Sequence, residues 1–102
     1  MSNVSVKFVV NTNASNNVYI IGSVPALGGW NPEKAIEMKS EGNGVFTLSK
    51  LLATGGIVEF KVLSGKSWDK VEKGVYNEEI KNHIIAPEKG LVVDISVARF
   101  NK

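Results

Sequence analysis

The 102-residue sequence contains no cysteine and only one histidine, His83. Without cysteine, the chain can form neither a disulfide framework nor a cysteine-ligated zinc site, and it has no thiol nucleophile. Nucleophilic catalysis of the Ser–His type would depend on His83, which stands beside two isoleucines in an expected strand and is interpreted as a structural or solvent-facing residue. No calcium-loop ladder of Asp and Asn occurs either. No cofactor and no metal site is therefore expected.

The chain also has no large excess of charge and no long apolar run. It carries 12 Lys and Arg against 10 Asp and Glu, so the formal net charge is +2, and both signs are mixed along the sequence. Such a balance produces no strong field for nucleic acid or for an anionic membrane. No apolar run approaches the ~20 residues of a membrane-spanning helix. We therefore expect neither nucleic acid nor a membrane as a partner.

Helical periodicity is missing as well, whereas the period of two that is typical of strands recurs along the chain. In the stretch around Phe60, the apolar side chains are expected to face the interior, with Glu59 and Lys61 facing outward. Glycine, asparagine and proline signals separate the expected strands. These strands are residues 4–10, 18–22, 35–39, 45–51, 57–63, 80–86 and 91–100. The pattern predicts one all-β domain, residues 1–102, built as a sandwich or a small barrel.

The acidic residues do not point to catalysis. A pair of carboxylates can hydrolyse glycosidic bonds, but the acidic residues here alternate with lysines, as they do on ordinary solvated surfaces. The residues considered for such a pair are Glu33, Glu37, Glu59, Asp69, Glu72, Glu78 and Glu79. Together with the missing nucleophiles, this pattern predicts that the chain is not an enzyme.

Two tryptophans stand out because polar or turn-forming residues flank them. Trp30 lies in Gly-Trp-Asn-Pro and Trp68 in Lys-Ser-Trp-Asp-Lys, whereas a core tryptophan more usually lies in an apolar alternating run. The flanks favour exposure of at least one ring, and packing of both rings in the core is the alternative. An exposed indole can stack on the apolar face of a pyranose ring while nearby amides and ammonium groups bind the hydroxyls. Lys61 and Asn82 are candidates for those polar contacts; their alternative interpretations are a solvated lysine and a turn asparagine.

Several segments resemble family 20 carbohydrate-binding modules, the starch-binding domains. The most specific is residues 19–30, where the strand Tyr-Ile-Ile-Gly-Ser is followed by Leu-Gly-Gly-Trp. Glu-Phe-Lys at residues 59–61 resembles the aromatic-lysine strand of that family. Residues 67–72, Ser-Trp-Asp-Lys-Val-Glu, resemble the segment with its second tryptophan, and residues 77–83 resemble the stretch with its sugar-contacting asparagine. The resemblance covers nearly the whole chain.

The resemblance implies an immunoglobulin-like antiparallel β-sandwich of about seven to eight strands that binds α-1,4-glucans without cleaving them. Trp30 and Trp68 would form a two-ring platform, with Lys61 and Asn82 as polar partners. The implied ligands are starch, glycogen and maltooligosaccharides. The resemblance also implies an attached catalytic domain and an extracellular location within a larger secreted enzyme.

The sequence departs from the family pattern at three places. Lys81 and His83 replace the usual proline and arginine around Asn82, and the segment between Trp68 and Asn82 is longer than in short fungal members. The regions of the second, tyrosine-based glucan site of the family contain no aromatic residue here, so that site is expected to be weak or missing. Tyr76 is expected to be a loop residue and not a main ligand contact. The alternative function is a structural or protein-interaction sandwich that has lost sugar binding.

Overall fold

The computed structural model describes residues 2–101, which form ten β-strands and three short 3₁₀ turns. The strands are β1 (Asn3–Asn11), β2 (Tyr19–Gly22), β3 (Ile36–Glu37), β4 (Lys39–Gly42), β5 (Val45–Ala53), β6 (Val58–Leu63), β7 (Glu72–Lys73), β8 (His83–Ile85), β9 (Val92–Ser96) and β10 (Arg99–Phe100). The 3₁₀ turns are η1 (Pro25–Leu27), η2 (Pro32–Lys34) and η3 (Trp68–Lys70). None of the helices in residues 2–101 is long and apolar enough to cross a membrane.

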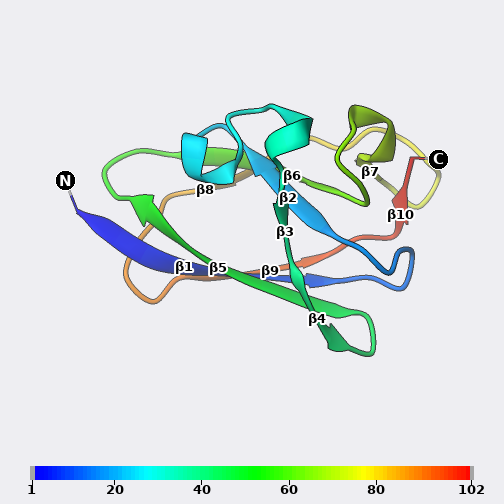
Figure 1. The fold of residues 1–102 in the computed structure, drawn as a ribbon, viewed down its shortest axis with the longest axis horizontal. Helices are drawn as coiled ribbons and strands as arrows, with labels where there is room; N and C mark the ends of the chain where they lie inside the picture. The colour runs from blue at the N-terminus through cyan, green and yellow to red at the C-terminus, as the bar shows by residue number, and fades with distance from the viewer. Residues whose placement is uncertain (1, 102) are drawn as a thin grey trace.

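The strands form two four-stranded sheets that make up the layers of a sandwich (Figure 1). One sheet has the order β4-β5-β1-β9 and the other the order β3-β2-β6-β8, and β10 and β7 form a separate pair. The predicted all-β sandwich is confirmed. The pairing is antiparallel except between β1 and β9, where Lys7 lies opposite Val92 in a parallel register. That pair joins the two ends of the chain, a long-range contact that the local pattern does not predict.

The main core lies between the two sheets, where the expected alternation of β1 and β6 is confirmed. Val6, Phe8 and Val10 of β1 are fully buried, as are Phe60 and Val62 of β6. The rings of Phe8 and Phe60 meet edge to face across the sandwich, with centroids 5.1 Å apart and planes inclined by 81°. Such pairs contribute about 0.5–1.5 kcal/mol beyond the area that they bury.

A second, smaller cluster lies on the outer side of the β3-β2-β6-β8 sheet. Ile20 and Val62 face the main core, so their neighbours Ile21 and Leu63 face the opposite way. Ile21 and Leu63 are fully buried there together with Ala35, because the chain after β2 folds back over this face. Figure 1 shows η2 and η3 above β2 and β6, whereas η1 lies to one side and its Leu27 belongs to the main core. This covered face is where the predicted site residues lie.

Three of the expected strands are divided or shortened in the structure. The segment 91–100 is divided into β9, which joins the β4-β5-β1-β9 sheet, and β10, which pairs with β7. The segment 35–39 contributes β3 to one sheet and the start of β4 to the other. Met38 marks the crossing, since it is buried and its N–H donates to the Val18 carbonyl oxygen at 2.8 Å. The segment 80–86 forms only the short strand β8, because the residues before His83 make side-chain contacts to β6 instead of a ladder.

The core position of Phe8 makes a direct test of this fold possible. We expect Phe8→Ala to lower the free energy of unfolding by about 3–5 kcal/mol, because it leaves a cavity between the sheets. Val92→Ala removes a side chain that is 56% exposed, so its effect should stay within about 0.5 kcal/mol. Urea denaturation followed by circular dichroism measures both values, and equal effects would contradict the described core.

Candidate functional site

Trp30 follows two glycines in the turn between β2 and β3. Its φ of 62° is a left-handed conformation, which is uncommon for a bulky side chain. The Trp30 N–H donates to the Gly22 carbonyl oxygen at 2.9 Å and closes the turn. At Gly28, φ is +89° and an added Cβ would lie 2.8 Å from the Lys34 carbonyl oxygen, so a side chain does not fit there. The Leu-Gly-Gly-Trp sequence thus builds the turn that presents the indole ring.

The Trp30 ring is half-buried. It lies outside the main core and packs against the small cluster of Ile21, Ala35 and Leu63. The sequence left open whether this ring is a core residue or a surface platform. The structure shows an intermediate position, in which part of the ring is supported by the protein and part of it remains accessible.

Trp68 comes from the η3 turn that follows β6. The Ser67 side chain caps this turn by accepting a hydrogen bond from the Asp69 N–H at 3.2 Å. The Trp68 side chain is 42% exposed. Its ring centroid lies 6.0 Å from that of Trp30, and the two planes are inclined by 36°. The two indoles therefore form one continuous aromatic surface with a bend.

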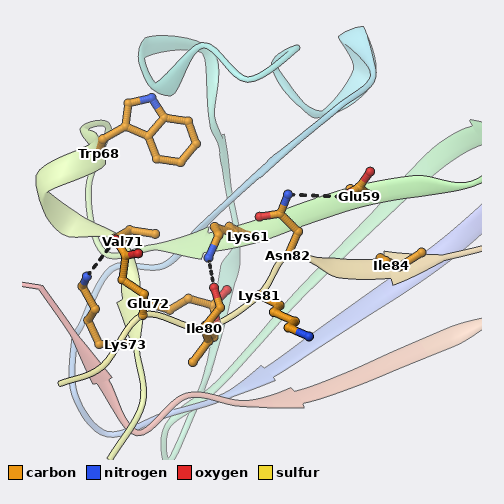
Figure 2. A pocket seen from close by; sticks show the side chains of 11 residues that line it. Glu59, Lys61, Trp68, Val71, Glu72, Lys73, Ile80, Lys81, Asn82 and Ile84 are labelled. Atoms are coloured by element: carbon orange, nitrogen blue, oxygen red, sulfur yellow. Dashed lines mark hydrogen bonds and ion pairs between the residues drawn. The ribbon is translucent and has the colours of Figure 1, made fainter. Parts of the chain in front are cut away.

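A hollow of about 580 Å³ opens beside Trp68, and both Lys61 and Asn82 line it (Figure 2). Lys61 projects from the outward side of β6, as the strand period predicts, and its Nζ donates to the Ile80 carbonyl oxygen. The Asn82 Nδ2 donates to Glu59 Oε1 at 3.2 Å. These two contacts hold the 80–82 segment against β6.

The structure brings all four predicted residues into one region. Lys61, Trp68 and Asn82 line the hollow, and Trp30 adjoins it through its contact with Trp68. The aromatic surface and the amide and ammonium donors suit a neutral ligand rich in hydroxyl groups. Within residues 2–101, no group of three or more His, Cys, Asp or Glu side chains is placed to hold a metal ion.

Two acidic residues, Glu59 and Glu72, take part in this region although neither was predicted to belong to the binding site. The position of Glu59 follows from the strand period, which places its side chain on the same side of β6 as that of Lys61. The burial of Glu72 differs from what its sequence neighbours predict. Its alternation with lysines predicts a solvated carboxylate, but the residue is 1% exposed, so that prediction is wrong. No local signal in the sequence marks its burial.

The Glu72 carboxylate joins three segments. Its Oε2 accepts a hydrogen bond from the Val62 N–H at 2.6 Å, beyond the point where β8 stops pairing with β6. The His83 Nε2 lies 3.0 Å from Glu72 Oε1 and 2.9 Å from Oε2. The His83 ring in turn stacks on Phe60, with centroids 5.0 Å apart. His83 therefore has a structural role, and it fixes the end of the segment that carries Asn82.

The sequence matches a protein family described as the starch binding domain, over residues 2–94. Amylopullulanase from Thermoanaerobacter thermohydrosulfuricus is 40% identical over 70 residues, which make up 69% of this chain and 4% of that protein. The chain therefore spans only a small part of the length of this relative.

Several solved structures share the fold, and two of them illustrate the likeness. The family 15 glucoamylase from Hypocrea jecorina superposes with a TM-score of 0.73 at 18% identity, covering 100% of this chain and 18% of that chain. The family 20 carbohydrate-binding module of a maltotetraose-forming amylase from Pseudomonas saccharophila STB07 superposes with a TM-score of 0.69 at 23% identity. It covers 91% of this chain and 99% of that chain.

The buried carboxylate of Glu72 yields a stability prediction. We expect Glu72→Ala to lower the free energy of unfolding by about 3–5 kcal/mol, because the Val62 N–H and the His83 ring lose their buried partner. Glu79→Ala is the control, since the Glu79 side chain is 90% exposed and pairs with Lys73 only at 3.7 Å. Its effect should stay below about 1 kcal/mol. Chemical denaturation compares the two variants, and similar losses would argue against the joining role of Glu72.

Proposed function

The chain belongs to the starch binding domain family, whose members are non-catalytic carbohydrate-binding modules, and we propose that it binds α-1,4-glucans at its two tryptophans and the adjoining hollow. As a member of this family, the chain is a binding module and not a catalytic domain. The proposed ligands are starch, glycogen and maltooligosaccharides. Residues 1–102 would make up one such module.

The observation that supports the proposed site is the contact between Trp30 and Trp68. Their centroids are 6.0 Å apart and their planes inclined by 36°, so successive sugar rings on the two indoles would also be inclined to each other. An α-1,4-glucan is a curved chain, and a bent aromatic surface fits it better than it fits a flat chain such as cellulose. Stacking would bury the apolar faces of the sugars, while Lys61 and Asn82 would bind hydroxyl groups.

We expect one site of this size to bind glucan with modest affinity, with a Kd on the order of micromolar to millimolar, because few contacts offset the cost of ordering the ligand. Modest affinity suits a tethered module. The amylopullulanase and the glucoamylase relatives are much longer than this chain, which covers 4% and 18% of them. We propose that the module raises the local concentration of an attached catalytic domain on its polymer.

Binding can be measured directly through the tryptophans. We expect maltoheptaose and β-cyclodextrin to change the intrinsic fluorescence in a saturable manner, because both indoles of the chain lie in the proposed site. Cellohexaose, a flat β-linked chain, serves as the control and should cause no such change. An unchanged spectrum with α-glucan up to about 50 mM would contradict the proposal and favour a sandwich that has lost sugar binding.

The two tryptophans should differ in their effect on stability. Trp68→Ala is expected to abolish measurable binding while changing the free energy of unfolding by only about 0.5 kcal/mol, since the side chain is 42% exposed. Trp30→Ala should abolish binding as well, but at a cost of about 2 kcal/mol, because the ring packs on the small cluster. Calorimetric titration and thermal denaturation provide the two readouts. If Trp68→Ala binds glucan as tightly as the parent chain, the Trp68 ring is not part of the binding site.

A further inference from the structure

Tyr76 is the most exposed of the large hydrophobic side chains that the structure describes. It is 89% exposed, and the neighbouring Val75 is 59% exposed. Both lie at the tip of the loop that joins β7 to the segment with Asn82. The proposed binding by the two tryptophans makes no use of this loop. An exposed tyrosine ring resembles the tryptophan surface in chemistry, because it combines an apolar face with a polar tip.

The loop that carries Tyr76 has a defined backbone. The Gly74 N–H donates to the Glu78 carbonyl oxygen at 2.9 Å, and the Asn77 N–H donates to the Gly74 carbonyl oxygen at 2.9 Å. The Glu78 carboxylate accepts a hydrogen bond from the Tyr76 N–H at 2.8 Å. At the base, Lys73 pairs with Glu79 at 3.7 Å. These contacts define the backbone of the loop at Tyr76, which lowers the cost of ordering the loop around a ligand.

A second hollow, of about 770 Å³, lies on the other side of the η3 turn and of the loop after β7. Trp68 and Lys73 line the first hollow, whereas Lys70 and Asn77 line the second. The η3 turn and the loop after β7 thus separate the two hollows and contribute to both. Figure 1 shows this loop beyond η3, near the C-terminal strand β10, so it continues the row of turns that covers the β2-β6 face.

The groups that line the second hollow are suited to hydroxyl ligands. Lys70, Asn77 and Arg99 supply ammonium, amide and guanidinium donors, and Ser64 supplies a hydroxyl. We propose that this hollow and the Tyr76 ring extend the glucan path, so that a chain bound on Trp30 and Trp68 passes over η3 and stacks a further sugar on Tyr76. This extension rests on the proposed function of the tryptophan site.

The extension predicts that Tyr76 matters for long ligands only. Tyr76→Ala should weaken maltoheptaose binding about three- to tenfold, which corresponds to the loss of one exposed stacking contact, and leave maltotriose binding unchanged. Tyr76→Phe keeps the aromatic face and should retain the affinity of the parent chain. Leu51→Ala removes a side chain that is 64% exposed near the end of β5, and Figure 1 shows the end of that strand on the opposite side of the molecule from β10. This variant should bind both ligands as the parent chain does. Isothermal titration calorimetry measures all four proteins with both oligosaccharides.

The outcomes separate the extension from the proposal on which it rests. If the parent chain binds neither oligosaccharide, both ideas are wrong. If the parent chain binds and Tyr76→Ala matches Leu51→Ala for both ligands, only the extension is wrong. An equal loss for maltotriose and maltoheptaose would also overturn it, because Tyr76 would then act on the tryptophan site itself. A loss for maltoheptaose alone, restored in Tyr76→Phe, is the result that the extension requires.

Discussion

The position of Phe60 is the constraint on which both the sandwich and the site depend. Its fully buried ring meets Phe8 of the opposite sheet on one side, at 5.1 Å, and the His83 ring on another, at 5.0 Å. Because successive side chains of a strand point to opposite faces, inward packing of Phe60 forces its neighbours Glu59 and Lys61 outward. The same interaction that joins the sheets therefore sets the direction of the polar groups beside Trp68.

The glycines around β2 act through backbone geometry. A Cβ at Gly22 would lie 2.8 Å from both the Glu59 carbonyl oxygen and the Leu27 Cδ1, so this strand end can approach β6 and the η1 turn closely only as glycine. Gly22 also accepts the hydrogen bond from the Trp30 N–H. Close packing at one residue thus connects the strand, the turn and the ring that the turn presents. This explains why the Gly-Ser and Leu-Gly-Gly-Trp elements occur together in the sequence.

The features that could be predicted from the sequence are those with local causes. The strand period determines the buried face of β1 and the outward direction of Lys61, and glycine geometry determines the Trp30 turn. The burial of Glu72 has a different origin, since its partners Val62 and His83 are supplied by two other strands and no short-range pattern encodes them. The parallel β1–β9 pair and the contact between Trp30 and Trp68 are long-range in the same sense. The grouping of the four site residues follows from the resemblance to the family, because periodicity alone does not bring them together.

The internal hydrogen bonds of the site are compatible with ligand binding because they leave donors free. An ammonium group has three N–H donors, and Lys61 uses one of them on the Ile80 carbonyl oxygen. The Asn82 amide has two N–H donors and an acceptor oxygen, and its bond to Glu59 uses one donor. Both groups are thus held in position by the protein while they retain hydrogen-bonding capacity toward the hollow. A neutral sugar brings no charge that would compete with the Glu72–His83 pair, so it can occupy the proposed site without disturbing the contacts that shape it.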